Sequence, residues 1–176
     1  MKHLSVRQLT LDAMLAAMCA VLGYLSLDFG NVKVTFESVP VLLAALLFGA
    51  ADGMAVGGIG TLLYQLLRYG VSATTALWVA PYVLAGALVG LYARRRGFVL
   101  EPRQLVCAVG GAEALITLLN TGALYVDSRL YGYYYPGIIL GALALRLVLC
   151  LARAAVYSAV LPLLLRPIRR ACGKTA

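Results

Sequence analysis

Long apolar stretches separated by short polar breaks occupy nearly the whole chain, and this pattern constrains the fold more than any other feature. Crossing a bilayer as a helix takes about 20 apolar residues. The apolar stretches cover approximately residues 9–27, 39–48, 54–67, 74–92, 105–125 and 138–165. The sequence therefore predicts an all-α integral membrane protein, a bundle of six transmembrane helices that forms a single domain over residues 1–176.

The low charge content supports this interpretation. Only 12% of the residues are charged and 62% are hydrophobic, whereas about a quarter of the residues of a soluble domain are charged. So few charged residues cannot cover a water-facing surface. The stretch 39–48 is too short to span a bilayer alone, and we expect it to include residues from the segment 34–38.

The positions of Lys and Arg predict the orientation, because cytoplasmic loops are enriched in these residues. With six crossings, both termini share one side with the breaks after the second and fourth stretches. That side carries ten basic residues, namely Lys2, Arg7, Arg94, Arg95, Arg96, Arg103, Arg166, Arg169, Arg170 and Lys174. The opposite side carries three, namely Lys33, Arg68 and Arg129. Both termini are therefore predicted to be cytoplasmic. The net charge of +8 is interpreted as a consequence of this orientation, and we expect no nucleic-acid partner.

Ionisable residues at membrane depth are costly unless paired or hydrated, so each is a functional candidate. Glu113 lies about ten residues into the fifth stretch, close to mid-membrane at about 1.5 Å per residue. Arg153 on the antiparallel sixth stretch reaches a similar depth, and we predict an ion pair between the two. Arg146 lies nearer the outside and is expected to face an outward-opening cavity. With His3 as the single histidine and no nucleophile beside Glu113, we expect neither an enzyme nor a metal or cofactor site.

Aromatic and charged residues gather at the outer ends of the stretches. Four of the eleven tyrosines lie between residues 131 and 135. An aromatic belt at the lipid headgroups explains part of this pattern. Aromatic faces beside several cations also suit a planar ligand that bears carboxylates. The candidate ligand-binding residues are Lys33, Glu37, Gln65, Arg68, Trp78, Asn120, Arg129, Tyr133 and Arg146.

Small residues at helical spacing predict close helix contacts. The first stretch carries two overlapping Ala-x-x-x-Ala pairs, Ala13 with Ala17 and Ala16 with Ala20, and these four residues are candidates for binding a partner protein or an internal neighbour. The third carries Gly53, Gly57 and Gly60, for which packing within the bundle is the preferred interpretation.

Two segments resemble a known family. Residues 34–49, VTFESVPVLLAALLFG, contain Phe36-x-x-x-Pro40, and residues 117–121, TLLNT, contain Asn120-Thr121. With the six-helix layout, the short second helix and the alanine pairs, they resemble the substrate-binding S components of energy-coupling factor (ECF) vitamin transporters. Within that group they are most similar to the folate family, which shares both motifs.

The resemblance implies a mechanism and partners. An S component captures a water-soluble vitamin from outside, here with folate favoured. It then topples in the lipid of the cell membrane while docked on a transmembrane coupling subunit that two cytoplasmic ATPases drive. The family's alanine surface maps onto Ala13 and Ala17, and also onto Ala16 and Ala20. Glu37 and Asp127 would hydrogen-bond a pterin ring edge.

Three alternatives stay open from the sequence. In the first alternative, the ligand is another vitamin or precursor, such as pantothenate, which needs fewer stacking groups. A second alternative is a ligand-free membrane scaffold similar to the rod-shape protein MreD, whose outer polar residues are dispensable. A third is a self-sufficient secondary transporter, although no convincing internal repeat relates residues 1–90 to residues 91–176.

Overall fold

The computed structural model describes residues 6–29 and 32–171. The elements of these residues are, in order, α1 (Val6–Tyr24), β1 (Leu27–Phe29), β2 (Val32–Val34), α2 (Ser38–Leu47), α3 (Ala50–Tyr69), α4 (Thr75–Arg95), α5 (Pro102–Leu130) and α6 (Pro136–Ala171). Each of the six predicted helices is present. Among the described helices, α1, α4, α5 and α6 are long and apolar enough to cross a membrane, so six crossings stay a prediction.

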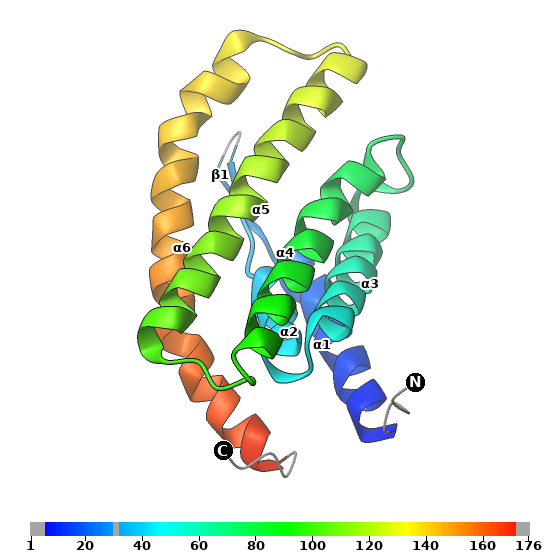
Figure 1. Ribbon diagram of the computed structural model, residues 1–176. Coiled ribbons are helices and arrows are strands. Elements are labelled where there is room, and N and C mark those ends of the chain that lie inside the picture. The colour runs from blue at the N-terminus through cyan, green and yellow to red at the C-terminus, as the bar shows by residue number, and fades with distance from the viewer. Residues whose placement is uncertain (1–5, 30–31, 172–176) are drawn as a thin grey trace.

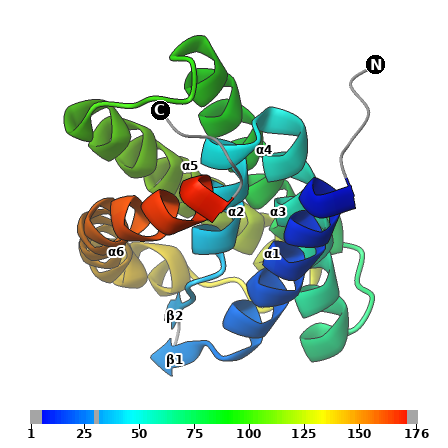
Figure 2. The same cartoon turned by 90° about the horizontal axis from the view of Figure 1, so that it is seen from below.

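The short helix α2 is the centre of the core. Nine of its ten residues are buried, and it packs against α1, α3, α4 and α6 (Figure 2). A helix that is apolar on all sides is buried by its neighbours. At 1.5 Å per residue α2 is about 15 Å long, roughly half the thickness of the hydrocarbon core. The burial of nine of its ten residues therefore explains why this helix is too apolar for a surface helix although it is too short to span a membrane.

The expectation that this helix includes residues from the segment 34–38 is met only at Ser38. Val34 pairs with Leu27 in the antiparallel β1–β2 hairpin, and α2 begins at Ser38. Pro40 gives the physical reason. Proline is tolerated in the first turn of a helix, but further inside it clashes with the carbonyl four residues back. The helix therefore starts within two residues of Pro40.

The helices form two groups (Figure 1). Helices α1 to α4 pack around the core, and α5 and α6 form a long antiparallel pair along one side. The start of α1 and the end of α6 lie at the same end of the bundle as the α2–α3 and α4–α5 connections. The hairpin and the α3–α4 and α5–α6 connections lie towards the opposite end, for which the sequence predicts the outer face.

The connection between α5 and α6 is shorter than predicted. The sequence suggested a break over residues 126–137, but α5 continues to Leu130 and α6 starts at Pro136. Residues 126–130 contain neither Gly nor Pro, so nothing interrupts the helix there. It ends next to Gly132, whose φ of 76° favours glycine, and proline is favoured in the first turn of the next helix.

Glycines hold α3 close to its neighbours, which confirms that the spacing of Gly53, Gly57 and Gly60 reflects packing within the bundle. A Cβ on Gly53 would lie 2.9 Å from the carbonyl oxygen of Gly86 in α4. A Cβ on Gly60 would lie 2.8 Å from the carbonyl oxygen of Ala16 in α1. The tightest approach is at Gly90 of α4, where a Cβ would lie 2.3 Å from the backbone nitrogen of Ala50.

Gly90→Ala is therefore expected to destabilise the protein by about 1–3 kcal/mol, because the new methyl group meets backbone that cannot rotate away. Thermal unfolding in detergent measures the effect. Gly122→Ala is the matched control, since a Cβ there meets nothing within 4 Å. Replacing an open helical glycine by alanine stabilises a helix by up to about 1 kcal/mol. Equal melting temperatures for the two variants would contradict the close α3–α4 approach.

Candidate functional site

A polar cavity of about 420 Å³ lies between α3, α4, α5, α6 and the segment that precedes α2. Its lining residues come from β2, the segment before α2, helices α3 to α6 and the connections between α3 and α4 and between α5 and α6. They are Val34, Thr35, Glu37, Tyr64, Gln65, Tyr69, Ser72, Thr74, Trp78, Tyr82, Thr117, Asn120, Leu124, Asp127, Tyr131, Tyr133, Arg146, Leu149 and Arg153. A volume of this size is typical of sites for one small organic molecule.

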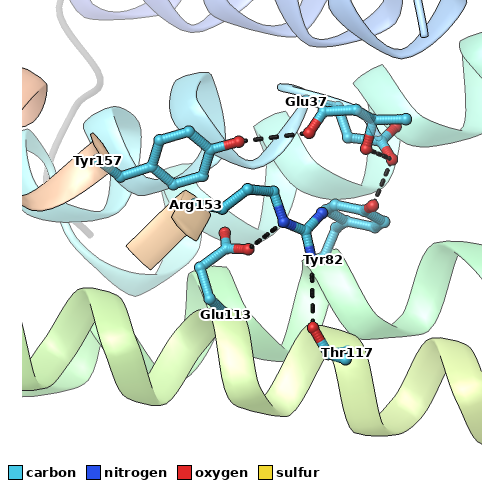
Figure 3. Close-up of polar contacts among 7 residues, drawn as sticks. Glu37, Tyr82, Glu113, Thr117, Arg153 and Tyr157 are labelled. Carbon is cyan, nitrogen blue, oxygen red and sulfur yellow. Dashed lines mark hydrogen bonds and ion pairs between the residues drawn. The ribbon is translucent and has the colours of Figure 1, made fainter. Parts of the chain in front are cut away.

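A buried carboxylate marks one wall of the cavity. Glu37 immediately precedes α2 and is only 3% exposed. Its Oε1 accepts hydrogen bonds from Thr35 Oγ1 at 3.0 Å and from the Tyr82 hydroxyl. These donors fix the carboxylate in place (Figure 3). A positioned acceptor in the cavity wall suits a ligand that presents N–H groups.

The predicted ion pair between Glu113 and Arg153 is confirmed. Arg153 Nε lies 3.2 Å from Glu113 Oε2, and Arg153 Nη2 donates to Thr117 Oγ1 at 3.2 Å (Figure 3). Glu113 is completely buried, whereas the Arg153 side chain is 13% exposed and lines the cavity. The pair therefore joins α5 to α6 and presents a guanidinium to the cavity.

Arg146 and Asn120 form the polar wall nearer the α5–α6 connection. Arg146 Nη1 donates to Thr121 Oγ1 at 3.1 Å, which orients the guanidinium across the α5–α6 pair. Asn120 Oδ1 is buried and has no hydrogen-bond partner among the described residues. A buried polar atom without a partner costs about 1–3 kcal/mol. A ligand or water that donates to Asn120 would remove this cost.

The rim of the cavity at this end is organised around Asp127 near the end of α5. Its carboxylate accepts hydrogen bonds from Thr74 Oγ1 and from the Tyr133 hydroxyl, and so joins the α3–α4 and α5–α6 connections. Burial, together with the hydrogen bond to Asp127 and its negative charge, raises the pKa of Tyr133 to about 12. The phenol therefore stays neutral near pH 7 and remains a donor. Tyr131, Tyr133 and Trp78 add aromatic faces to the lining.

The cavity brings together six of the nine predicted ligand-binding residues, namely Glu37, Gln65, Trp78, Asn120, Tyr133 and Arg146. Arg68 lies apart, where its Nη1 donates to the Tyr24 carbonyl at 3.0 Å and to Ser26 Oγ at 3.2 Å. Arg129 also lies apart, with its guanidinium 4.2 Å from the Tyr134 ring centroid. Lys33 is in β2, and its side chain lies outside the described part of the structure. For these three residues ligand binding stays a prediction.

The structure adds lining residues that the sequence did not single out, above all Tyr64, Tyr82 and Thr117. Each lies inside an apolar stretch. The sequence could have indicated these residues by one feature, a polar side chain within an apolar stretch. A tyrosine or threonine at membrane depth favours the protein interior or a cavity.

The two alanine pairs of α1 face different surroundings. Ala16 and Ala20 are 5% and 8% exposed, and Ala16 lies against Gly60 of α3. They pack inside the chain and are not on its surface. Ala13 and Ala17 are exposed. The predicted partner surface therefore narrows to the Ala13–Ala17 side of α1.

The fold and its cavity define a class, a helical protein with candidate membrane spans and a cavity of the size that one small molecule occupies. The family model described as "ECF transporter, substrate-specific component" matches residues 7–165, and the chain belongs to this family of S components. A solved structure of the S component of a bacterial ECF transporter is similar, with 24% sequence identity and a TM-score of 0.65. The match covers 93% of this chain and 96% of that one, so the two share a fold. Among curated proteins none matches the chain.

Proposed function

We propose that this S component captures a water-soluble vitamin from outside the cell, with folate as the leading ligand. The observation that carries the proposal is the cavity, which places buried acceptors, aromatic faces and guanidinium groups around one volume of about 420 Å³. Such a set suits a planar heterocycle with N–H donors and attached carboxylates.

The lining supports a specific placement of folate. The pterin ring edge donates hydrogen bonds to Glu37, which Thr35 and Tyr82 hold in place. The aromatic rings of the ligand stack on Trp78 and Tyr133, and a carboxylate of the tail lies against Arg146. Pantothenate lacks an aromatic ring and would leave the stacking groups unused.

Trp78 supplies the test, because it is the single tryptophan of the chain and it lines the cavity. We expect folate to quench the tryptophan fluorescence of the purified protein saturably and with 1:1 stoichiometry. Saturable binding of pantothenate in place of folate would keep vitamin capture and reject the folate assignment. If no vitamin of a full panel binds, this result would contradict vitamin capture and favour a ligand-free scaffold.

Import is proposed to depend on a transmembrane coupling subunit and two cytoplasmic ATPases. This assembly follows from membership in a family of transporter components and from the exposed alanines of α1. Small residues on a lipid-facing helix surface permit close approach of another helix.

The variant Ala13→Leu/Ala17→Leu is expected to reduce co-purification with the coupling subunit at least tenfold, because the added side chains keep the partner helix at a distance. Pull-down after coexpression with the tagged coupling subunit measures this loss, and fluorescence titration is expected to show unchanged ligand binding. Ala152→Leu/Ala155→Leu makes the same change on the exposed surface of α6 and serves as the control. Equal recovery of both variants would contradict a docking role for this side of α1.

A further inference from the structure

A second cavity of about 380 Å³ lies between α4 and α5 and shares no lining residue with the ligand cavity. We call it the α4–α5 groove. Its lining is apolar except for one hydroxyl and one thiol, and it consists of Ala85, Leu88, Val89, Tyr92, Cys107, Ala108, Gly111, Ala112 and Leu115. Neither the family assignment nor vitamin capture gives this groove a role.

Two arginines continue the rows of lining residues at helical spacing. On α5, Cys107, Gly111 and Leu115 follow one another at intervals of four residues, and Arg103 continues this row one turn earlier. Residues four apart lie on the same helix face. On α4 the row through Ala85, Val89 and Tyr92 is continued by the residue four positions after Tyr92, which is Arg96.

Both arginines stand at the same end of the groove, where the short α4–α5 connection joins the two helices (Figure 1). The guanidinium carbon of Arg96 lies 5.6 Å from the ring centroid of Tyr92, which is itself a lining residue. Arg96 and Arg103 are exposed. The two arginines are not lining residues themselves, but they continue the apolar rows past this end of the groove.

We propose that the α4–α5 groove holds one acyl chain of an anionic phospholipid, with the phosphate between Arg96 and Arg103. The groove extends about 10 Å from Ala85 to Tyr92 at 1.5 Å per residue, which suits a linear hydrocarbon chain. Basic pockets between membrane helices are suited to anionic headgroups. An uncharged occupant would make no use of the two guanidinium groups, so charge complementarity favours this lipid.

Gly111 keeps the groove open. A Cβ added to it would meet nothing within 4 Å, so the space beside it is empty of protein atoms. Glycine costs about 1 kcal/mol in a helix relative to alanine. The position can therefore accept a side chain that fills the groove, which provides a direct test.

The test is native mass spectrometry of the full-length protein with equimolar phosphatidylglycerol and phosphatidylcholine of matched chains. We expect 1:1 adducts that favour phosphatidylglycerol at least about tenfold. Arg96→Gln/Arg103→Gln is expected to abolish this preference. Gly111→Phe is expected to remove the adduct itself, whereas Gly110→Phe, at a neighbouring open glycine outside the lining, is expected to retain it.

A second charge-matched variant makes the result decisive. Arg94→Gln/Arg166→Gln removes the same two charges away from the rows, and we expect it to keep the lipid preference. Equal loss in both arginine variants would show diffuse attraction and overturn the site. The proposed lipid site would also be overturned if the wild type forms a dimer that Gly111→Phe removes. Equal binding of both lipids by the wild type would overturn it as well. If Gly111→Phe does not fold, the comparison of the two arginine variants still decides the proposal.

Discussion

Arg153→Met is expected to lower the stability of the protein by about 3 kcal/mol, the largest single effect that we predict on folding. The substitution leaves the Glu113 carboxylate completely buried without the guanidinium that lies 3.2 Å from it. Removing one partner of a buried ion pair costs about 3–5 kcal/mol, because the remaining charge is uncompensated. Thermal unfolding in detergent, followed by circular dichroism, measures the loss.

The double variant Glu113→Gln/Arg153→Met separates the ion pair from simple packing. Replacing both charges removes the uncompensated carboxylate, so the double variant is expected to recover most of the lost stability. Additive losses, with the double variant less stable than Arg153→Met, would contradict a structural ion pair between α5 and α6.

Glu37→Gln is expected to weaken ligand binding by about 10- to 100-fold. Hydrogen bonds to a charged group contribute about 1.5–3 kcal/mol, and each 1.4 kcal/mol corresponds to a tenfold change in affinity. The Gln side chain keeps the size and one acceptor but loses the charge. Fluorescence titration with folate measures the change. Glu37 lines the cavity, where Thr35 and Tyr82 donate hydrogen bonds to its Oε1.

Glu101→Gln is the matched control for this prediction. It makes the same chemical change at an exposed residue that precedes α5, at the end of the bundle remote from the cavity. We expect unchanged affinity there. Wild-type affinity in Glu37→Gln, with the variant folded, would exclude Glu37 from the ligand contacts.

The existence and order of the helices were predictable from hydropathy, and so was the Glu113–Arg153 pair. The pair was predicted from depth, because residues of two antiparallel helices at equal depth can lie side by side, and an ionisable side chain at that depth is costly without a partner. Helix boundaries were less predictable. The start of α2 depends on Pro40 and on a three-residue strand pairing, and neither changes the hydropathy of the segment.

The composition of the cavity was predictable only in part, because hydropathy does not fix the rotation of a membrane helix. Lipid-facing and core-facing surfaces are both apolar, so the sequence does not reveal which face of α4 carries Tyr82. The same ambiguity explains the alanine pairs. Ala13 and Ala16 differ in exposure, although both are small and belong to equally spaced pairs.

The most direct test of vitamin capture is native mass spectrometry of the protein purified from cells grown in rich medium, followed by denaturation to identify any released molecule. We expect stoichiometric release of a folate, and loss of this ligand in Trp78→Ala and Arg146→Ala. Release of another vitamin would reject folate while retaining capture. A protein without any bound molecule, whose melting temperature no vitamin changes, would contradict the proposed function.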